Sequence, residues 1–166
     1  MLRLFGEIKE SITDGPGLRY TVFAQGCPHY CTGCHNPESH SFTDGYLVEE
    51  EKVIEEIIKN PLLDGVTLSG GEPFMQASEL AYIAGAVKAR GLSVIVFSGY
   101  TFEELLALSN ERKGYRALLE NTDILIDGRF DAGKKSMDLR FRGSANQRAI
   151  DVPASLQNGN VVLYPL

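Results

Sequence analysis

The chain has 166 residues, 43% of them hydrophobic and 23% charged, with a formal net charge of −6, a composition typical of a soluble globular protein. No apolar run approaches the roughly 20 residues needed to cross a bilayer, and charged residues among the first ten exclude a secretory signal, so we expect no membrane partner and a cytoplasmic location. Scattered Lys and Arg argue against a nucleic-acid partner, and the absence of a linker predicts a single domain over residues 1–166.

Short β-rich runs alternate with amphipathic helical patterns along the chain. In chain order, the sequence predicts a strand over 20–23, a helix over 48–58, a strand over 66–69, a helix over 78–90, a strand over 93–98, a helix over 102–109 with a capping box, and a strand over 124–127. This alternation is typical of parallel strands joined by crossover helices, so the fold class is α/β. A closed eight-unit barrel needs about 200 residues or more, which leaves an open partial (β/α) barrel of about four to six parallel strands.

All three cysteines, Cys27, Cys31 and Cys34, lie within eight consecutive positions after the first predicted strand. An odd number of thiols so close together predicts a metal-binding loop rather than a disulfide framework. Zinc would take the three thiolates together with His29 or His35 in a closed structural site. A 4Fe-4S cluster would take the three thiolates and keep one iron open for chemistry. The spacing favours the cluster and leaves zinc as the alternative.

Polar and glycine-rich segments follow the later predicted strands, whose carboxyl ends should meet at one edge of the sheet. Glycine lets the backbone approach a ligand closely, and a glutamate after such a pair is a charged acceptor for an ammonium group. The alternatives are an ordinary turn after the second and third strands and a mutual salt bridge between Asp127 and Arg129 after the fourth. The candidate binding residues are Gly70, Gly71, Glu72, Ser98, Asp127 and Arg129.

The cysteine spacing resembles the signature of the radical S-adenosylmethionine (SAM) superfamily. This resemblance implies a 4Fe-4S cluster on the three cysteines, with SAM bound to the open iron and cleaved to a 5′-deoxyadenosyl radical that abstracts a hydrogen atom. It also implies that residues 70–72 bind the methionine part of SAM. The superfamily often has an aromatic residue just before the third cysteine, where this chain has Gly33, and His35 could supply the ring instead.

Other segments narrow the resemblance. Residues 14–19 resemble a segment of the enzymes that activate glycyl-radical proteins, and residues 98–100, 126–130 and 141–148 resemble, in that order, the family that activates anaerobic ribonucleoside-triphosphate reductase. The resemblance implies hydrogen abstraction from a glycine of that reductase, a flavodoxin or ferredoxin as electron donor, and chemistry carried by SAM and the cluster rather than by a catalytic side chain. Two alternatives stay open: activation of another glycyl-radical enzyme such as pyruvate formate-lyase, and a non-catalytic zinc-binding interaction module.

Overall fold

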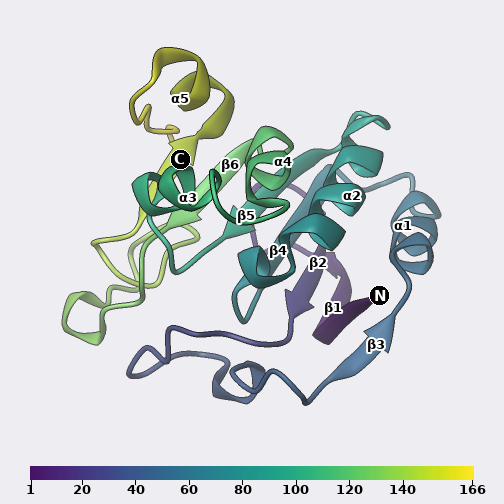
Figure 1. The fold of residues 1–166 in the computed structure, drawn as a ribbon, viewed down its shortest axis with the longest axis horizontal. Helices are drawn as coiled ribbons and strands as arrows, with labels where there is room; N and C mark the ends of the chain where they lie inside the picture. The colour runs from purple at the N-terminus through teal and green to yellow at the C-terminus, as the bar shows by residue number, and fades with distance from the viewer.

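The computed structural model describes all residues from Met1 to Leu166 and arranges them around one seven-stranded sheet (Figure 1). The strands stand in the order β3-β1-β2-β4-β5-β6-β7, in which β2, β4, β5 and β6 run parallel and the other three run antiparallel to their neighbours. The strands are β1 (Leu2–Ser11), β2 (Arg19–Ala24), β3 (Tyr46–Val48), β4 (Gly65–Gly70), β5 (Ser93–Phe97), β6 (Ile124–Asp127) and β7 (Arg148–Asp151).

The four predicted strands are confirmed as the parallel centre of this sheet, but the prediction of an all-parallel arrangement is wrong. Only residues 12–18 join β1 to β2, and so short a connection cannot hold a crossover helix, so the two strands pair antiparallel. Residues 128–147 join β6 to β7 with only a short 3-10 turn between them, and this pair is antiparallel as well. The observed fold is therefore α/β with a mixed sheet, and the partial barrel is not confirmed beyond that class.

The three predicted helices are confirmed, and two short ones accompany them. Thr101 and Glu104 form the predicted capping box at the start of α3, with Thr101 Oγ1 accepting from the Glu104 amide and the Glu104 side chain accepting from the Thr101 amide. No helix is both long enough and apolar enough to cross a bilayer. The helices are α1 (Glu50–Ile58), α2 (Ala77–Lys88), α3 (Phe102–Leu108), α4 (Tyr115–Glu120) and α5 (Val152–Asn158), and the 3-10 turns are η1 (Pro37–Ser39), η2 (Pro73–Gln76) and η3 (Ala132–Lys134).

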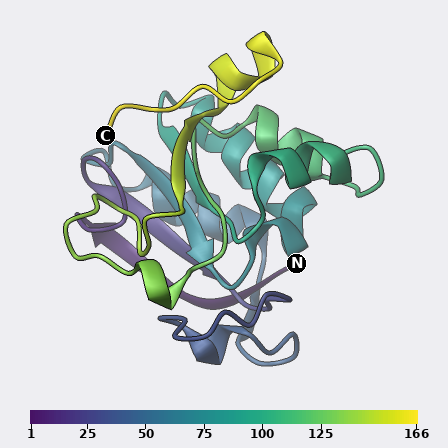
Figure 2. The same ribbon diagram turned by 90° about the vertical axis from the view of Figure 1, so that its left-hand side faces the viewer.

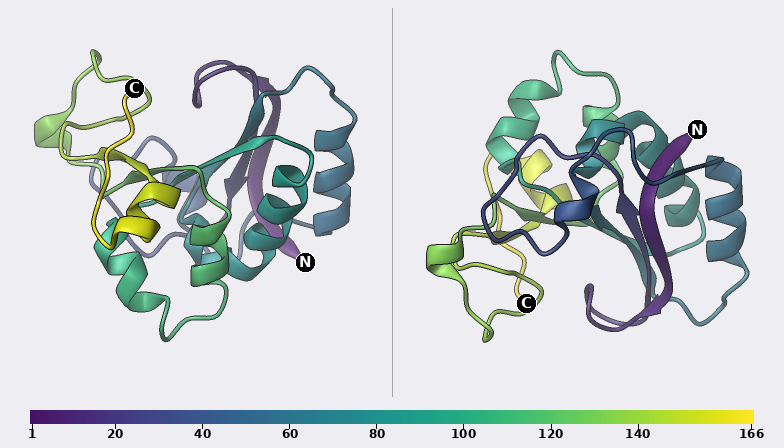
Figure 3. Two further views of the ribbon diagram at one scale, coloured as in Figure 1. Left: turned by 90° about the horizontal axis from the view of Figure 1, so that it is seen from above. Right: turned by 90° about the horizontal axis from the view of Figure 1, so that it is seen from below.

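The two faces of the sheet have different roles. Alternate strand residues such as Val22, Leu68 and Val96 join the main apolar core with residues of α1 to α4, so the helices cover one face. The left panel of Figure 3 shows these helices on one side of the sheet, with the loop segments on the other. The second face is polar near β2 and β4, and the loop of residues 12–18 packs on it. No helix of the main core covers this face, so it is available to form a ligand site.

A buried guanidinium fixes that loop to the sheet. Arg19 is 1% exposed, and it donates to the carbonyl oxygens of Pro16, Val66 and Ser93 and to the hydroxyls of Thr67 and Ser93 at 2.8–3.1 Å. No carboxylate contacts it, so burial lowers the Arg19 pKa to about 10. The residue therefore joins the loop before β2 to both β4 and β5.

Candidate functional site

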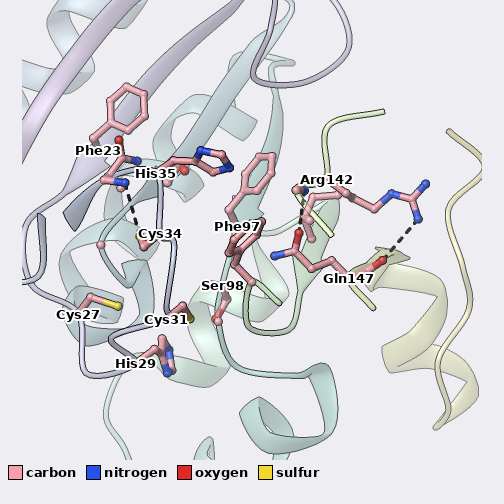
Figure 4. A pocket seen from close by; sticks show the side chains of 18 of the residues that line it. Phe23, Cys27, His29, Cys31, Cys34, His35, Phe97, Ser98, Arg142 and Gln147 are labelled. Atoms are coloured by element: carbon pink, nitrogen blue, oxygen red, sulfur yellow. Dashed lines mark hydrogen bonds between the residues drawn. The ribbon is translucent and has the colours of Figure 1, made fainter. Parts of the chain in front are cut away.

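A cavity of about 490 Å³ lies at the carboxyl ends of the parallel strands and contains all three cysteines (Figure 4). Its wall comes from segments far apart in the sequence: the cysteine loop after β2, residues 69–71 at the end of β4, Ser98 and Gly99 after β5, and Gly128 after β6. Parallel strands place these four ends together, as the sequence predicted. The cavity is the place where a ligand could meet the thiols and the strand ends at once.

The cysteine loop owes its shape to backbone turns that few residues can adopt. Gly26 and Gly33 have φ of 108° and 77°, and Tyr30 has φ of 50°, so the chain turns sharply before Cys27 and between the other two cysteines. The Gly26 amide donates to the Ser39 carbonyl oxygen at 2.7 Å, which closes the loop on itself through the turn η1. These turns bring the sulfur atoms to one cavity instead of spreading them along an extended strand.

The three thiols are free, and all of them line the cavity. Cys27 is buried, and burial raises the pKa of its thiol, while backbone amides of His29 and Tyr30 pointing at the sulfur act in the opposite direction. No three His, Cys, Asp or Glu side chains come close enough together to hold one metal ion. Three thiols that line one cavity match the number of protein ligands that a 4Fe-4S cluster with one open iron needs.

Glu72 is the centre of a buried hydrogen-bond network that joins two walls of the cavity. Its side chain is fully buried. One carboxylate oxygen accepts from the Phe74 amide at 3.0 Å and the Ser98 hydroxyl at 2.9 Å. The other accepts from His29 Nε2 and from the Gly99 amide, both at 2.8 Å. All four contacts are internal, and Glu72 is not part of the cavity wall, so this arrangement favours a positioning role over the direct ammonium contact predicted from the sequence.

His29, which the sequence suggested only as a zinc ligand in the alternative metal site, connects the cysteine loop to this network. Its ring is 4% exposed and packs against Gly99, where a Cβ would lie 2.4 Å from the ring. Tyr100 contacts the same ring edge-on, with 4.6 Å between the ring centroids. A histidine two positions after a cysteine carries no pattern of its own in the sequence, because its partners lie about 40 and 70 residues away.

The two glycines before Glu72 permit close packing beneath the cysteine loop. A Cβ on Gly70 would lie 2.4 Å from the Ala24 amide nitrogen, and one on Gly71 would lie 2.4 Å from the Gly26 carbonyl oxygen. The amides of Gly71 and Glu72 donate to the carbonyl oxygens of Ala24 and Gly26, at 2.7 and 2.8 Å. Bare backbone therefore forms this part of the cavity wall, as a site that receives a ligand against its main chain requires.

Asp127 and Arg129 lie beside the cavity rather than in its wall. Buried Asp127 accepts from the Phe102 amide at 2.8 Å, at the start of α3, and from the Arg148 guanidinium on β7. This contact and one with Glu103 raise the pKa of Arg148. Arg129 pairs instead with Glu104 at 3.3 Å, so the two residues do not form the mutual salt bridge that the sequence left open as the alternative to ligand binding. Each of the two residues pairs with a residue of another element, and such a partner cannot be identified from proximity in the sequence.

Gly33 and His35 both lie against the segment that follows β6. A Cβ on Gly33 would lie 3.4 Å from the Phe130 ring and 3.7 Å from the Ala132 side chain. The His35 ring lines the cavity and stands 5.2 Å from the Phe130 ring at an angle of 60°. The two rings together give the cavity an aromatic side next to Cys34, consistent with a binding surface for a planar base.

Other residues of the cavity wall come from segments for which the sequence predicted no particular ligand contact. Asp14 enters the cavity from the loop before β2, where its carboxylate accepts from the hydroxyls of Ser11 and Thr21. Gln147 orders the last segment, since its side chain accepts from the Gly143 amide at 2.8 Å and donates to the Gly128 carbonyl oxygen at 3.0 Å. The strand phenylalanines at 23 and 97 could have been identified by their alternation away from the core face.

Comparison with known proteins agrees with the cysteine geometry. Residues 13–150 match the profile of a family described as a 4Fe-4S single cluster domain. The anaerobic ribonucleoside-triphosphate reductase-activating protein of Haemophilus influenzae is 38% identical over 146 residues, which cover 82% of this chain and 89% of that protein. The proteins of the same name from Pasteurella multocida and Escherichia coli K12 are 38% and 32% identical, over 89% and 90% of their lengths. This chain belongs to that family of activating proteins.

Membership in the activating-protein family decides between the two metals that the cysteine spacing left open. The matched domain is one that holds a single 4Fe-4S cluster, and the chain has only three cysteines, all in the loop that lines the cavity. The interpretation as a small zinc-binding module is therefore not supported. The family match also spans every residue of the cavity wall, from Thr13 to Gln147.

Proposed function

We propose that this activating protein uses a 4Fe-4S cluster and SAM, bound side by side in the cavity, to generate a glycyl radical on anaerobic ribonucleoside-triphosphate reductase. One observation carries the proposal: three free thiols and the backbone ends of β4, β5 and β6 share one cavity in a chain of this family. Residues 1–166 would act as one radical SAM domain.

Cys27, Cys31 and Cys34 would hold the cluster and leave one iron for SAM. Once bound and reduced, the cluster supplies the single electron that cleaves SAM, so that a hydrogen atom can be removed from a glycine of the reductase. The side chains of this protein would then bind, orient and shield, because the radical chemistry is supplied by the cluster and SAM. Cys27 is buried and would shield a bound cluster from water on its side.

The methionine part of SAM would lie against the backbone of Gly70 and Gly71, which Glu72 holds in place from behind. Ser98 lines the same wall, with its hydroxyl already given to Glu72, so its backbone is the part that could face the ligand. His35, next to Phe130, would offer its ring to the adenine. Asp127 and Arg129 would act indirectly, by fixing the turn at Gly128, and Gly33 by admitting Phe130 beside the cluster loop.

The proposed reaction requires two protein partners, an electron donor and the reductase that presents the glycine. A one-electron donor is needed, because the chain has no second set of metal-binding cysteines, and a flavodoxin or ferredoxin is a suitable carrier. The substrate glycine must reach SAM inside the cavity, so the reductase must present it on a segment that can detach locally. Arg142, which lines the cavity without a carboxylate partner, would border the entrance.

The test is anaerobic reconstitution with iron and sulfide, followed by mixing with SAM, a reductant and the reductase. We expect about four irons per chain, the broad absorption of a 4Fe-4S cluster, and an electron paramagnetic resonance doublet from the glycyl radical that depends on SAM. A doublet formed only with pyruvate formate-lyase would reassign the partner. Bound zinc without iron would contradict the mechanism itself.

A further inference from the structure

A basic segment stands out in an otherwise acidic protein. Residues 129–142, which we call the basic segment, contain five Lys or Arg and two Asp side chains and so carry a net charge of +3. Because the whole chain carries −6, the remaining residues carry −9. A surface of one sign on a protein of the other sign steers a partner of complementary charge toward one place.

The basic segment has a defined shape. Asp131 caps the turn η3 by accepting from the Gly133 amide at 2.9 Å. Two hydrogen bonds tie the segment to the turn that follows it: the Asp131 amide donates to the Ser144 hydroxyl at 3.1 Å, and the Ala145 amide donates to the Lys134 carbonyl oxygen at 2.9 Å. Its charges are therefore presented on a folded loop, which lowers the entropic cost of binding a partner.

The basic segment lies directly against the cysteine loop. Phe130 and Ala132 approach Gly33, which stands between Cys31 and Cys34, and Phe130 also contacts the His35 ring. Figures 2 and 3 show the two loops side by side, the basic segment in yellow-green and the cysteine loop in dark blue. A protein docked on the basic segment would thus stand next to the cluster without entering the cavity.

Three of its five cations form no ion pair, and two of these, Lys135 and Arg140, lie outside the cavity wall, which Arg142 lines. Arg129 pairs with Glu104 at 3.3 Å and Lys134 lies 4.0 Å from Asp131, whereas Lys135 and Arg140 form no ion pair. Lys135 and Arg140 are exposed, and neither lines the cavity that the substrate glycine must enter. Their position suits a partner that needs to approach the cluster but not SAM.

We propose that the basic segment is the docking surface for an acidic redox protein that reduces the cluster. This inference rests on the proposed function and adds the place and charge of the electron donor. One electron passes from the donor to the cluster, so the donor is oxidised by one electron, the cluster is reduced by one, and no bond or proton changes hands. Redox proteins form complexes with small interfaces, and complementary charge steers their association. A short basic loop suits such a complex better than a broad apolar face does.

The experiment compares two charge-reversed holoproteins. Lys135→Glu/Arg140→Glu alters the basic segment, and Lys52→Glu/Lys113→Glu makes the same change in charge at two exposed, unpaired lysines on α1 and before α4. Each is mixed anaerobically with a reduced acidic flavodoxin, and the loss of visible cluster absorption is followed by stopped flow. We expect the first variant to be reduced about tenfold more slowly at low ionic strength, with the difference vanishing at high salt, and the control to match the native protein.

Photoexcited deazaflavin is a small uncharged reductant that needs no protein docking surface. Reduction by deazaflavin therefore tests the proposed function separately from the docking inference. The basic-segment variant should then gain its electron and form the glycyl radical on the reductase like the native protein. Equal slowing in the control variant, or native rates for the basic-segment variant with flavodoxin, would overturn the docking proposal. So would loss of the glycyl radical despite normal cluster reduction, because the segment would then bind the reductase. Failure of the native protein to form a radical with deazaflavin would refute the proposed function instead.

Discussion

Replacing Glu72 with Gln tests the buried network that holds the cysteine loop. The substitution keeps the shape of the side chain but changes one acceptor oxygen into an amide NH₂ group, which can only donate. Each carboxylate oxygen accepts from one backbone amide, Phe74 at 3.0 Å and Gly99 at 2.8 Å. Whichever way the new amide turns, one of these N–H groups therefore faces another donor and loses its partner.

The magnitude follows from that single orphaned group. The other two donors can adapt, because the Ser98 hydroxyl can rotate and the His29 ring can accept through Nε2 in its other tautomer. A buried backbone amide cannot adapt, and leaving one unsatisfied costs about 1 to 3 kcal/mol. We expect the free energy of unfolding to fall by about this amount. The attachment of the cysteine loop through His29 should weaken first.

The assay measures stability and iron retention in the same variant. Urea unfolding should give a lower midpoint for Glu72→Gln, and after reconstitution and desalting the variant should keep less iron than the native protein. Glu111→Gln, at an exposed residue without an ion pair, is the matched control and should change neither. Native stability and native iron retention combined with weaker SAM binding in isothermal titration would refute the reasoning, because the carboxylate would then contact SAM directly.

Three further changes test separate parts of the site. Gly99→Ala places a Cβ 2.4 Å from the His29 ring and should lower iron retention as Glu72→Gln does, with a native-like circular dichroism spectrum to show that the fold survives. Arg19→Lys replaces five hydrogen bonds with at most three, so the free energy of unfolding should fall by about 2 kcal/mol or more in urea titrations, and an unchanged midpoint would contradict the assigned role. Cys34→Ser should keep the unfolding midpoint of the metal-free protein but lose most of its iron on desalting, whereas full iron content would exclude Cys34 as a ligand.

The central strands could be predicted because their residues alternate or run together as apolar patterns between glycines. The flanking strands could not. β1 is interrupted by Gly6 and by charged residues, β3 has only three residues, and β7 has a charged residue at each end and only two apolar residues between them. Such strands exist because a neighbour offers free backbone groups to pair with, and that depends on the tertiary fold rather than on local sequence.

The same division holds within the site. The cysteines could be identified because metal chemistry restricts which residues and spacings serve, and the strand-end segments because parallel strands align their carboxyl ends. The partners of the charged residues could not be identified: Glu72 binds His29 and Gly99, and Asp127 binds Arg148, at separations of 43, 27 and 21 residues. Hydrogen-bond partners at such distances are set by packing, so sequence patterns alone predicted ligand contacts for side chains that are already satisfied.

The two buried carboxylates share a role that explains how the cavity stays available to a ligand. Glu72 joins the cysteine loop to the end of β5, and Asp127 joins the start of α3 to β7, so each fixes a loop from behind the wall. Asp14 is left as the one carboxylate that lines the cavity. Under the proposed function, such a site would bind its ligand through main chain and thiolates, whose positions are fixed before the ligand arrives. Substitution of either buried carboxylate should therefore reduce cluster retention before it changes SAM affinity, and this order of loss, measured by iron content and titration on one sample, separates a support from a ligand contact.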